Sequence, residues 1–108
     1  MQRGEVWWVD FGPALGSEIR KTRPAVIVSN NTANKLLARV QVVPLSGNIE
    51  NIYPSEALVK VGDKQSKAMT DQIATADKRR LKQPGGHLSD QDMKALERAL
   101  KIQLGLSL

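Results

Sequence analysis

Residues 23–30, RPAVIVSN, form a nearly continuous apolar run that begins with Arg23 and Pro24. Proline is tolerated at the first residue of a strand, and a run without polar alternation is typical of a strand that is buried on both faces. The residue before a proline is held in an extended conformation, so Arg23 is expected to project from the beginning of this strand. We therefore predict a buried central strand that carries a guanidinium at its start.

Further strands are predicted on both sides of this run. Residues 5–10 (EVWWVD) are aromatic and β-branched, and strand alternation places Val6 and Trp8 on one side and Trp7 and Val9 on the other. We interpret the two tryptophans as core and interface residues rather than as a platform for stacking bases.

The remaining segments are assigned by composition and spacing. Residues 39–45 and 55–61 are predicted to be strands, with a turn at 62–63 and a short helix within 30–37. Residues 67–76 are ambiguous, although their Thr and Ile content favours a strand. Residues 77–82 (DKRRLK) are expected to be a charged turn and residues 83–88 (QPGGHL) a loop.

The C-terminal segment is the clearest helix. Ser89 and Asp92 resemble a capping box, and Gly105 can end the helix in the left-handed conformation. Between them lies a stripe of apolar residues at helical spacing that is expected to be buried, formed by Met93, Leu96, Leu100 and Leu104. Short strands followed by one helix predict a mainly β (α+β) fold, a small half-open barrel with a C-terminal α-helix packed on it.

Length and composition limit the classes of protein that remain. The 108 residues suit a single domain spanning 1–108, and the absence of cysteine excludes disulfides and thiolate metal sites. No apolar stretch approaches the roughly 20 residues that span a bilayer, so we expect a cytoplasmic protein without a membrane partner. The single histidine, His87, and the scattered carboxylates lack the spacing of metal ligands, so neither a metal nor another cofactor is expected.

The chain is basic, with 16 Lys and Arg against 11 Asp and Glu and a formal net charge of +5. A polyanion such as nucleic acid is a plausible partner for such a chain, because cations neutralise phosphates. Charge alone leaves that partner open, since many basic proteins bind no nucleic acid.

The polar groups are concentrated in residues 16–24, GSEIRKTRP, which lie before the central strand. A connection of about a dozen residues is at the long end of the usual range, and such loops frequently carry function. Within it, Arg23 is the strongest candidate because Pro24 makes its backbone rigid. An ion pair of Arg23 with Glu18 or Asp10 on the surface is the alternative, and composition does not decide between them.

Three segments together are similar to one known family. Residues 3–31, 40–47 (VQVVPLSG) and 68–81 (AMTDQIATADKRRL) resemble the MazF/PemK/Kid family of toxin endoribonucleases, the mRNA interferases of bacterial toxin–antitoxin systems. The resemblance implies a CcdB-like, SH3-like barrel that forms a homodimer. It also implies sequence-specific cleavage of single-stranded mRNA without metal, leaving 2′,3′-cyclic phosphate and 5′-OH ends, and a cognate antitoxin whose acidic flexible tail occupies the basic groove.

The same resemblance assigns the catalytic residues. Arg23 matches the family's catalytic arginine, and Ser46 matches the Ser or Thr that ends the third strand and contributes to phosphate binding. Glu18 matches a carboxylate that some members use in catalysis. The chemistry agrees best for Arg23, because a guanidinium keeps its charge and can hold two phosphate oxygens.

The resemblance also indicates residues that contact RNA. Asp71 and Gln72 match an Asp-Gln pair near the RNA site of related toxins, and Ser17 stands where some members have a histidine. Arg20 and Lys21 belong to a loop that is bulkier and more basic than in many relatives, and we expect them to hold additional phosphates.

One departure concerns Met69, which stands where some relatives have an arginine. Arg79 and Arg80 are candidate replacements, with a solvated run of charges as the alternative. The alternatives for function are a gyrase poison of the same fold and an inactive SH3-like module that binds RNA or protein. Gyrase-poisoning relatives use a tryptophan near the C-terminus, whereas both tryptophans here are near the N-terminus.

Overall fold

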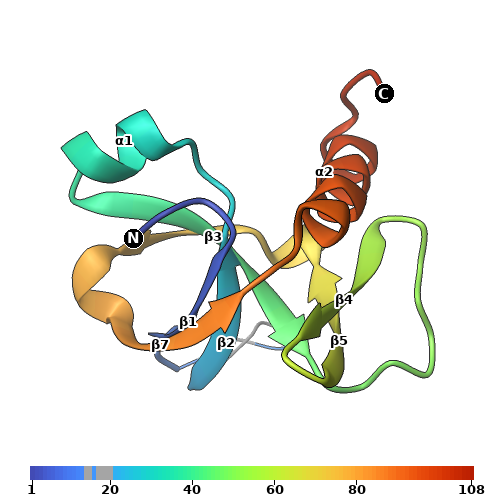
Figure 1. Cartoon of the computed structure of the whole chain (residues 1–108), viewed down its shortest axis with the longest axis horizontal. Helices are drawn as coiled ribbons and strands as arrows, with labels where there is room; N and C mark the ends of the chain where they lie inside the picture. The colour runs from blue at the N-terminus through green and yellow to red at the C-terminus, as the bar shows by residue number, and fades with distance from the viewer. Residues whose placement is uncertain (14–15, 17–20) are drawn as a thin grey trace.

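The computed structural model describes residues 1–13, 16 and 21–108, and Figure 1 gives the arrangement of the elements. In chain order the elements are β1 (Glu5–Asp10), β2 (Thr22–Ile27), α1 (Asn31–Leu36), β3 (Arg39–Ser46), β4 (Glu56–Val61), β5 (Lys64–Met69), the 3-10 turn η1 (Thr70–Gln72), β6 (Ala74–Asp77), the 3-10 turn η2 (Lys78–Arg80), β7 (Leu81–His87) and α2 (Asp90–Leu104).

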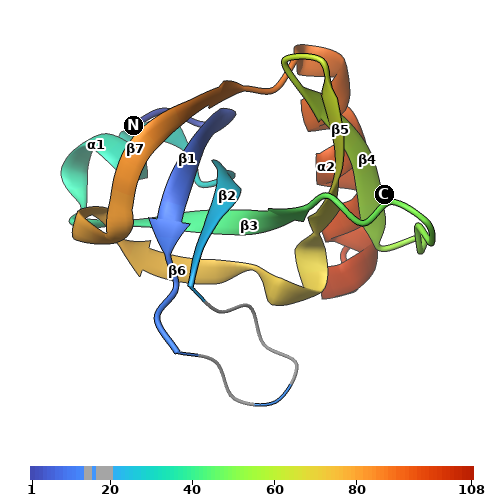
Figure 2. The same ribbon diagram turned by 90° about the horizontal axis from the view of Figure 1, so that it is seen from below.

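The strands form an antiparallel sheet in the order β4-β5-β3-β2-β1-β7, and β6 pairs with the first half of β3. The sheet curls into a half-open barrel with α2 packed beside it (Figure 2). The predicted mainly β fold with a C-terminal helix is confirmed. The apolar run at residues 23–30 is also confirmed as a central strand, because β2 lies between β1 and β3, although the strand ends at Ile27.

Alternate residues of the strands supply two core clusters. Val26 belongs to a first cluster that includes Met93 and Leu96 of α2, whereas Ala25 and Ile27 belong to a second cluster on the other face. Because β2 is covered on both faces, its sequence is apolar at consecutive positions instead of alternating.

The first strand alternates as predicted. Val6 is buried in the first cluster, and Val9 is buried in the second with Trp7 packed against it. Trp8 lies on the side of Val6, since a β-carbon at Gly85 would lie 3.5 Å from both side chains. Its position near the edge of the sheet leaves Trp8 41% exposed.

The helix α2 begins and ends at the predicted residues. Ser89 Oγ accepts a hydrogen bond from the Asp92 backbone N–H at 3.1 Å, and Gly105 has a φ of 70°. The carboxylate of Asp92 does not close a capping box, since its Oδ2 accepts from the Lys60 backbone N–H on β4 at 2.9 Å. This contact ties the start of the helix to the sheet.

The predicted burial of the apolar stripe on this helix is correct for its first turns only. Met93 and Leu96 are buried, but Leu104 is 52% exposed. The end of α2 extends beyond the strands in Figure 1, so Leu104 has no sheet surface to contact. Among the described residues, no helix is long and apolar enough to cross a membrane.

Two segments differ from the prediction. The expected loop at residues 83–88 is wrong, because Gln83 to His87 belong to β7, which pairs with β1. Proline and glycine are compatible with this strand because β7 is at the edge of the sheet and its pairing with β1 has irregular register. Residues 67–76, predicted as one strand, are divided by η1 into the end of β5 and the start of β6.

Candidate functional site

The pairing of β2 with β3 brings Arg23 and Ser46 together. The last recorded pair of this ladder is Ala25 with Pro44, and Arg23 and Ser46 each lie two residues beyond it at the same end of the two strands. Both residues are partly exposed, Arg23 at the second position of β2 and Ser46 at the last position of β3. Two residues that are 23 positions apart in the chain therefore share one edge of the barrel.

Arg23 lies at the rim of the second core cluster. Its partner on β1 is the buried Val9, and strand alternation places Arg23 on the same face as Ala25. Within the described residues the Arg23 side chain makes no hydrogen bond or ion pair. The expected alternative of an ion pair with Asp10 is not observed, since Asp10 Oδ1 accepts from the Gly12 backbone N–H at 2.9 Å. The alternative partner Glu18 lies outside the described residues. The guanidinium is thus held by a rigid backbone with its donors available to an anion.

Ser46 keeps a proton to donate. Its Oγ accepts a hydrogen bond from the Asn48 backbone N–H at 3.2 Å, and a serine hydroxyl that accepts still has its O–H free. The side chain is partly buried at the end of a strand, which limits its motion.

A partly buried ion pair lies on the other edge of β3. Lys67 of β5 pairs with Ser46 in the ladder, and its Nζ is 3.5 Å from Glu56 Oε2 and 3.2 Å from the Asn51 carbonyl oxygen. The side chains of Lys67 and Glu56 are only 14% and 10% exposed. These contacts fix the loop that follows Ser46. The sequence analysis missed both residues, because only the register of the β4–β5 hairpin brings them together.

The Asp-Gln pair lies beside the same end of β3. Asp71 and Gln72 belong to η1, which contacts β3 and connects β5 to β6 along one edge of that strand (Figure 2). Asp71 is exposed and Gln72 is partly buried. The turn is anchored by Thr70, whose hydroxyl donates to the Ser55 carbonyl oxygen. The ladders place η1 beside β3 between the Leu45–Ala68 and Val42–Ala74 pairs, on the edge of β3 opposite to β2.

Lys21 closes the base of the polar loop. Its backbone N–H donates to the Gly12 carbonyl oxygen at 3.0 Å, and its carbonyl accepts from the Phe11 N–H at 2.9 Å. Lys21 has a φ of 63°, a left-handed conformation that is uncommon for a non-glycine residue. Its side chain is exposed near Arg23. The predicted residues Ser17, Glu18 and Arg20 lie outside the described residues.

Two further positions from the sequence analysis are placed by the structure. Met69 is buried in the core, so this position contributes no charge to the surface. His87 is exposed at the end of β7. Over residues 1–13, 16 and 21–108, no group of three His, Asp or Glu side chains is close enough to hold a metal ion.

Comparison with known proteins gives one consistent result. Residues 2–104 match the family described as "PemK-like, MazF-like toxin of type II toxin-antitoxin system". The chain is 39% identical over 115 residues to a Mycobacterium tuberculosis protein named "Endoribonuclease MazF9", with 98% of each chain covered. It is also 39% identical over 111 residues to "Endoribonuclease MazF" of Staphylococcus saprophyticus, covering 98% of this chain and 92% of the relative.

A solved structure agrees with this result. The structure described as "Endoribonuclease in complex with its cognate antitoxin from Mycobacterial species" has a TM-score of 0.85 and 28% identity, and the match covers 100% of this chain and 98% of that one. The fold of this chain is therefore that of the endoribonuclease in this complex. This chain is a member of the PemK-like, MazF-like toxin family of type II toxin–antitoxin systems.

Proposed function

We propose that this protein is an endoribonuclease toxin that cuts single-stranded mRNA at specific sequences without a metal ion. The observation that carries the proposal is the Arg23 side chain, unpaired within the described residues, at the same end of the β2–β3 pair as Ser46. A fixed cation and a hydroxyl donor on one edge suit an anionic substrate such as a phosphodiester. Two relatives are named endoribonucleases, which supports RNA cleavage as the reaction.

In the proposed reaction the ribose 2′-oxygen attacks the adjacent phosphorus. A new P–O2′ bond forms and the P–O5′ bond breaks, leaving a 2′,3′-cyclic phosphate and a 5′-OH. Arg23 and Ser46 stabilise the negative charge that develops on the phosphoryl oxygens. Glu18 takes the proton from the 2′-OH, and the leaving 5′-oxygen gains a proton from a donor that we do not assign.

Other residues of the site bind the RNA strand in this proposal. Asp71 and Gln72 contact bases or riboses from η1. Ser17, Arg20 and Lys21 hold the strand from the loop before β2, with the two cations neutralising phosphates.

We further propose that residues 1–108 act as one domain in the cytoplasm and form a homodimer. The solved relative with its cognate antitoxin supports an antitoxin partner. The net charge of +5 favours a partner whose flexible tail is acidic.

The proposed function is tested by incubating the purified protein with a defined single-stranded RNA in EDTA and identifying the ends of the products. Cleavage that leaves 2′,3′-cyclic phosphate ends is the expected result. The matched DNA oligonucleotide lacks the attacking 2′-OH and should remain intact. Uncut RNA would contradict the proposal. Uncut RNA together with trapped gyrase–DNA complexes would instead support a gyrase poison, and binding without cutting would support an inactive module.

A further inference from the structure

Arg80 lies beside the site although it is far from it in the sequence. Arg80 belongs to η2, and its Nη1 donates to the Asp10 carbonyl oxygen at 3.1 Å across 70 residues of chain. The same nitrogen would be 3.7 Å from a β-carbon placed at Gly12. Asp10 is the last residue of β1 and pairs with Thr22 of β2, so this bond places Arg80 at the end of β1, one strand away from the strand that carries Arg23.

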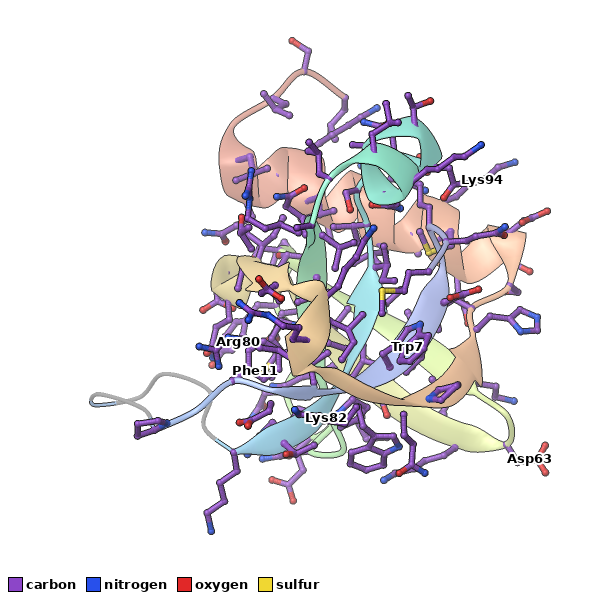
Figure 3. The ribbon with its side chains drawn as sticks, turned by 90° about the vertical axis from the view of Figure 1, so that its left-hand side faces the viewer. Trp7, Phe11, Asp63, Arg80, Lys82 and Lys94 are labelled. Atoms are coloured by element: carbon purple, nitrogen blue, oxygen red, sulfur yellow. The ribbon has the colours of Figure 1, made fainter. Side chains whose placement is uncertain are left out.

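Most N–H donors of the Arg80 guanidinium have no partner among the described residues. A guanidinium has five N–H groups, and the structure gives Arg80 one hydrogen bond within the described residues. No carboxylate there forms an ion pair with it, since the Asp10 side chain accepts from Gly12. The side chain is exposed, and in Figure 3 Arg80 lies beside Phe11 with Lys82 on the adjoining strand. Phe11 packs against the second core cluster, so the exposed charge of Arg80 lies at the border of that cluster.

The preceding arginine is engaged differently. Arg79 Nε is 3.0 Å from Asp77 Oδ1 and Arg79 Nη2 is 3.2 Å from Asp77 Oδ2, so its guanidinium is paired with a carboxylate through two bonds. Asp77 also accepts from the Arg79 backbone N–H at 2.8 Å. Of two adjacent exposed arginines, one has its charge neutralised locally and the other does not.

We propose that Arg80 is a second phosphate-binding arginine of the RNA site. One Nη group positions the end of β1 through the Asp10 carbonyl, and the remaining donors hold a phosphate of the RNA strand beside Arg23. This inference rests on the proposed function for its ligand. In this proposal Arg23 is the first cation of the site and Arg80 of η2 is the second. The buried Met69 supplies no charge.

The test compares Arg80→Gln with the matched control Arg79→Gln. Glutamine retains an N–H for the Asp10 carbonyl but removes the charge, so loss of binding by the first variant would not reflect loss of that bond. Affinity is measured by fluorescence anisotropy, over a range of salt concentrations, with a single-stranded RNA whose riboses are 2′-O-methylated and which cannot be cut.

We expect Arg80→Gln to weaken binding about tenfold at low salt. The slope of log affinity against log salt concentration should be smaller in magnitude by about 0.7, the value for one phosphate contact on a single strand. In cleavage of ordinary RNA the same variant should raise KM about tenfold and change kcat little. Arg80→Lys should recover most of the salt dependence. Arg79→Gln should bind as the wild type does.

Equal salt dependence in Arg80→Gln and Arg79→Gln would overturn the assignment of Arg80. If Arg80→Gln does not fold, Arg80→Met, which removes the charge and keeps a long side chain, is compared with Arg79→Met, and equal salt dependence of these two variants would likewise overturn the assignment. Wild-type protein that binds the methylated RNA but cuts no ordinary RNA would remove the proposed function. The binding comparison would still decide the role of Arg80.

Discussion

Arg23 has a position that depends on two neighbouring features of the chain. Pro24 holds its backbone extended, and the pairing of β2 with β3 places it at the end of the sheet where Ser46 ends β3. The side chain leaves from the rim of an apolar cluster, where a charge interacts more strongly with a bound phosphate than it would in open water.

Replacing Arg23 with alanine should therefore lower kcat by at least about 10²- to 10³-fold, the usual loss when one donor to the transition state is removed. The protein should still fold, because the side chain supports no other described residue. Single-turnover cleavage of RNA and circular dichroism measure the two effects. Arg98→Ala, which removes an exposed arginine from α2, should leave cleavage unchanged. An Arg23→Ala protein that cuts as fast as the wild type would contradict the assignment.

Asp77 provides a prediction for pH. The side-chain and backbone hydrogen bonds from Arg79 lower the pKa of Asp77 to about 2 from its ordinary value of 3.8. Because the pKa is lower in the folded state, the carboxylate stabilises η2 above the ordinary pKa, and this stabilisation is lost as the pH falls from about 4 towards 2.

Carboxyl NMR should give Asp77 a titration midpoint near pH 2. Arg79→Gln should move this midpoint up towards the ordinary value, and Arg80→Gln should move it much less, because Arg80 acts on Asp77 only through a weaker charge interaction. A wild-type midpoint near the ordinary value would show that the Arg79 pair does not persist in solution.

At the scale of the element, β7 is the segment where local sequence rules and the structure disagree. Pro84, Gly85 and Gly86 have the composition of a loop, yet the strand forms at the edge of the sheet. The two glycines have different roles. A β-carbon at Gly85 would meet Trp8 and Val6 at 3.5 Å, which is ordinary contact, whereas Gly86 has a φ of 110° and its β-carbon would lie 3.2 Å from Val61.

We therefore expect Gly86→Ala to lower the free energy of unfolding by about 1–3 kcal/mol, because alanine is strained at this φ. Gly85→Ala should cost clearly less. Urea unfolding of the two variants beside wild type measures both values. Equal losses would mean that β7 relaxes around the substitution.

At the scale of the whole molecule, the end of α2 leaves apolar surface in solvent. The exposed side chains there are Ile102, Leu104, Leu106 and Leu108. Exposed apolar clusters of this kind commonly mark contacts between proteins. Together with the family resemblance, they support the proposed homodimer.

Size-exclusion chromatography with light scattering should accordingly give twice the chain mass of 11.9 kDa at micromolar concentration. Dilution should shift the population towards the monomer mass only at much lower concentration, because an obligate interface of this kind buries apolar area. A constant mass of one chain at all concentrations would exclude the homodimer.

The sequence by itself determined most of the strands, the capped C-terminal helix and the half-open barrel, because apolar periodicity and the Ser89 and Gly105 caps act locally. It also indicated Arg23, since the effect of Pro24 is local. The tertiary structure decided that Lys67 pairs with Glu56, that β7 is a strand, and that Arg80 binds the Asp10 carbonyl whereas Arg79 binds Asp77. These features depend on strand register and on contacts across as many as 70 residues, and no local pattern in the sequence encodes such distances.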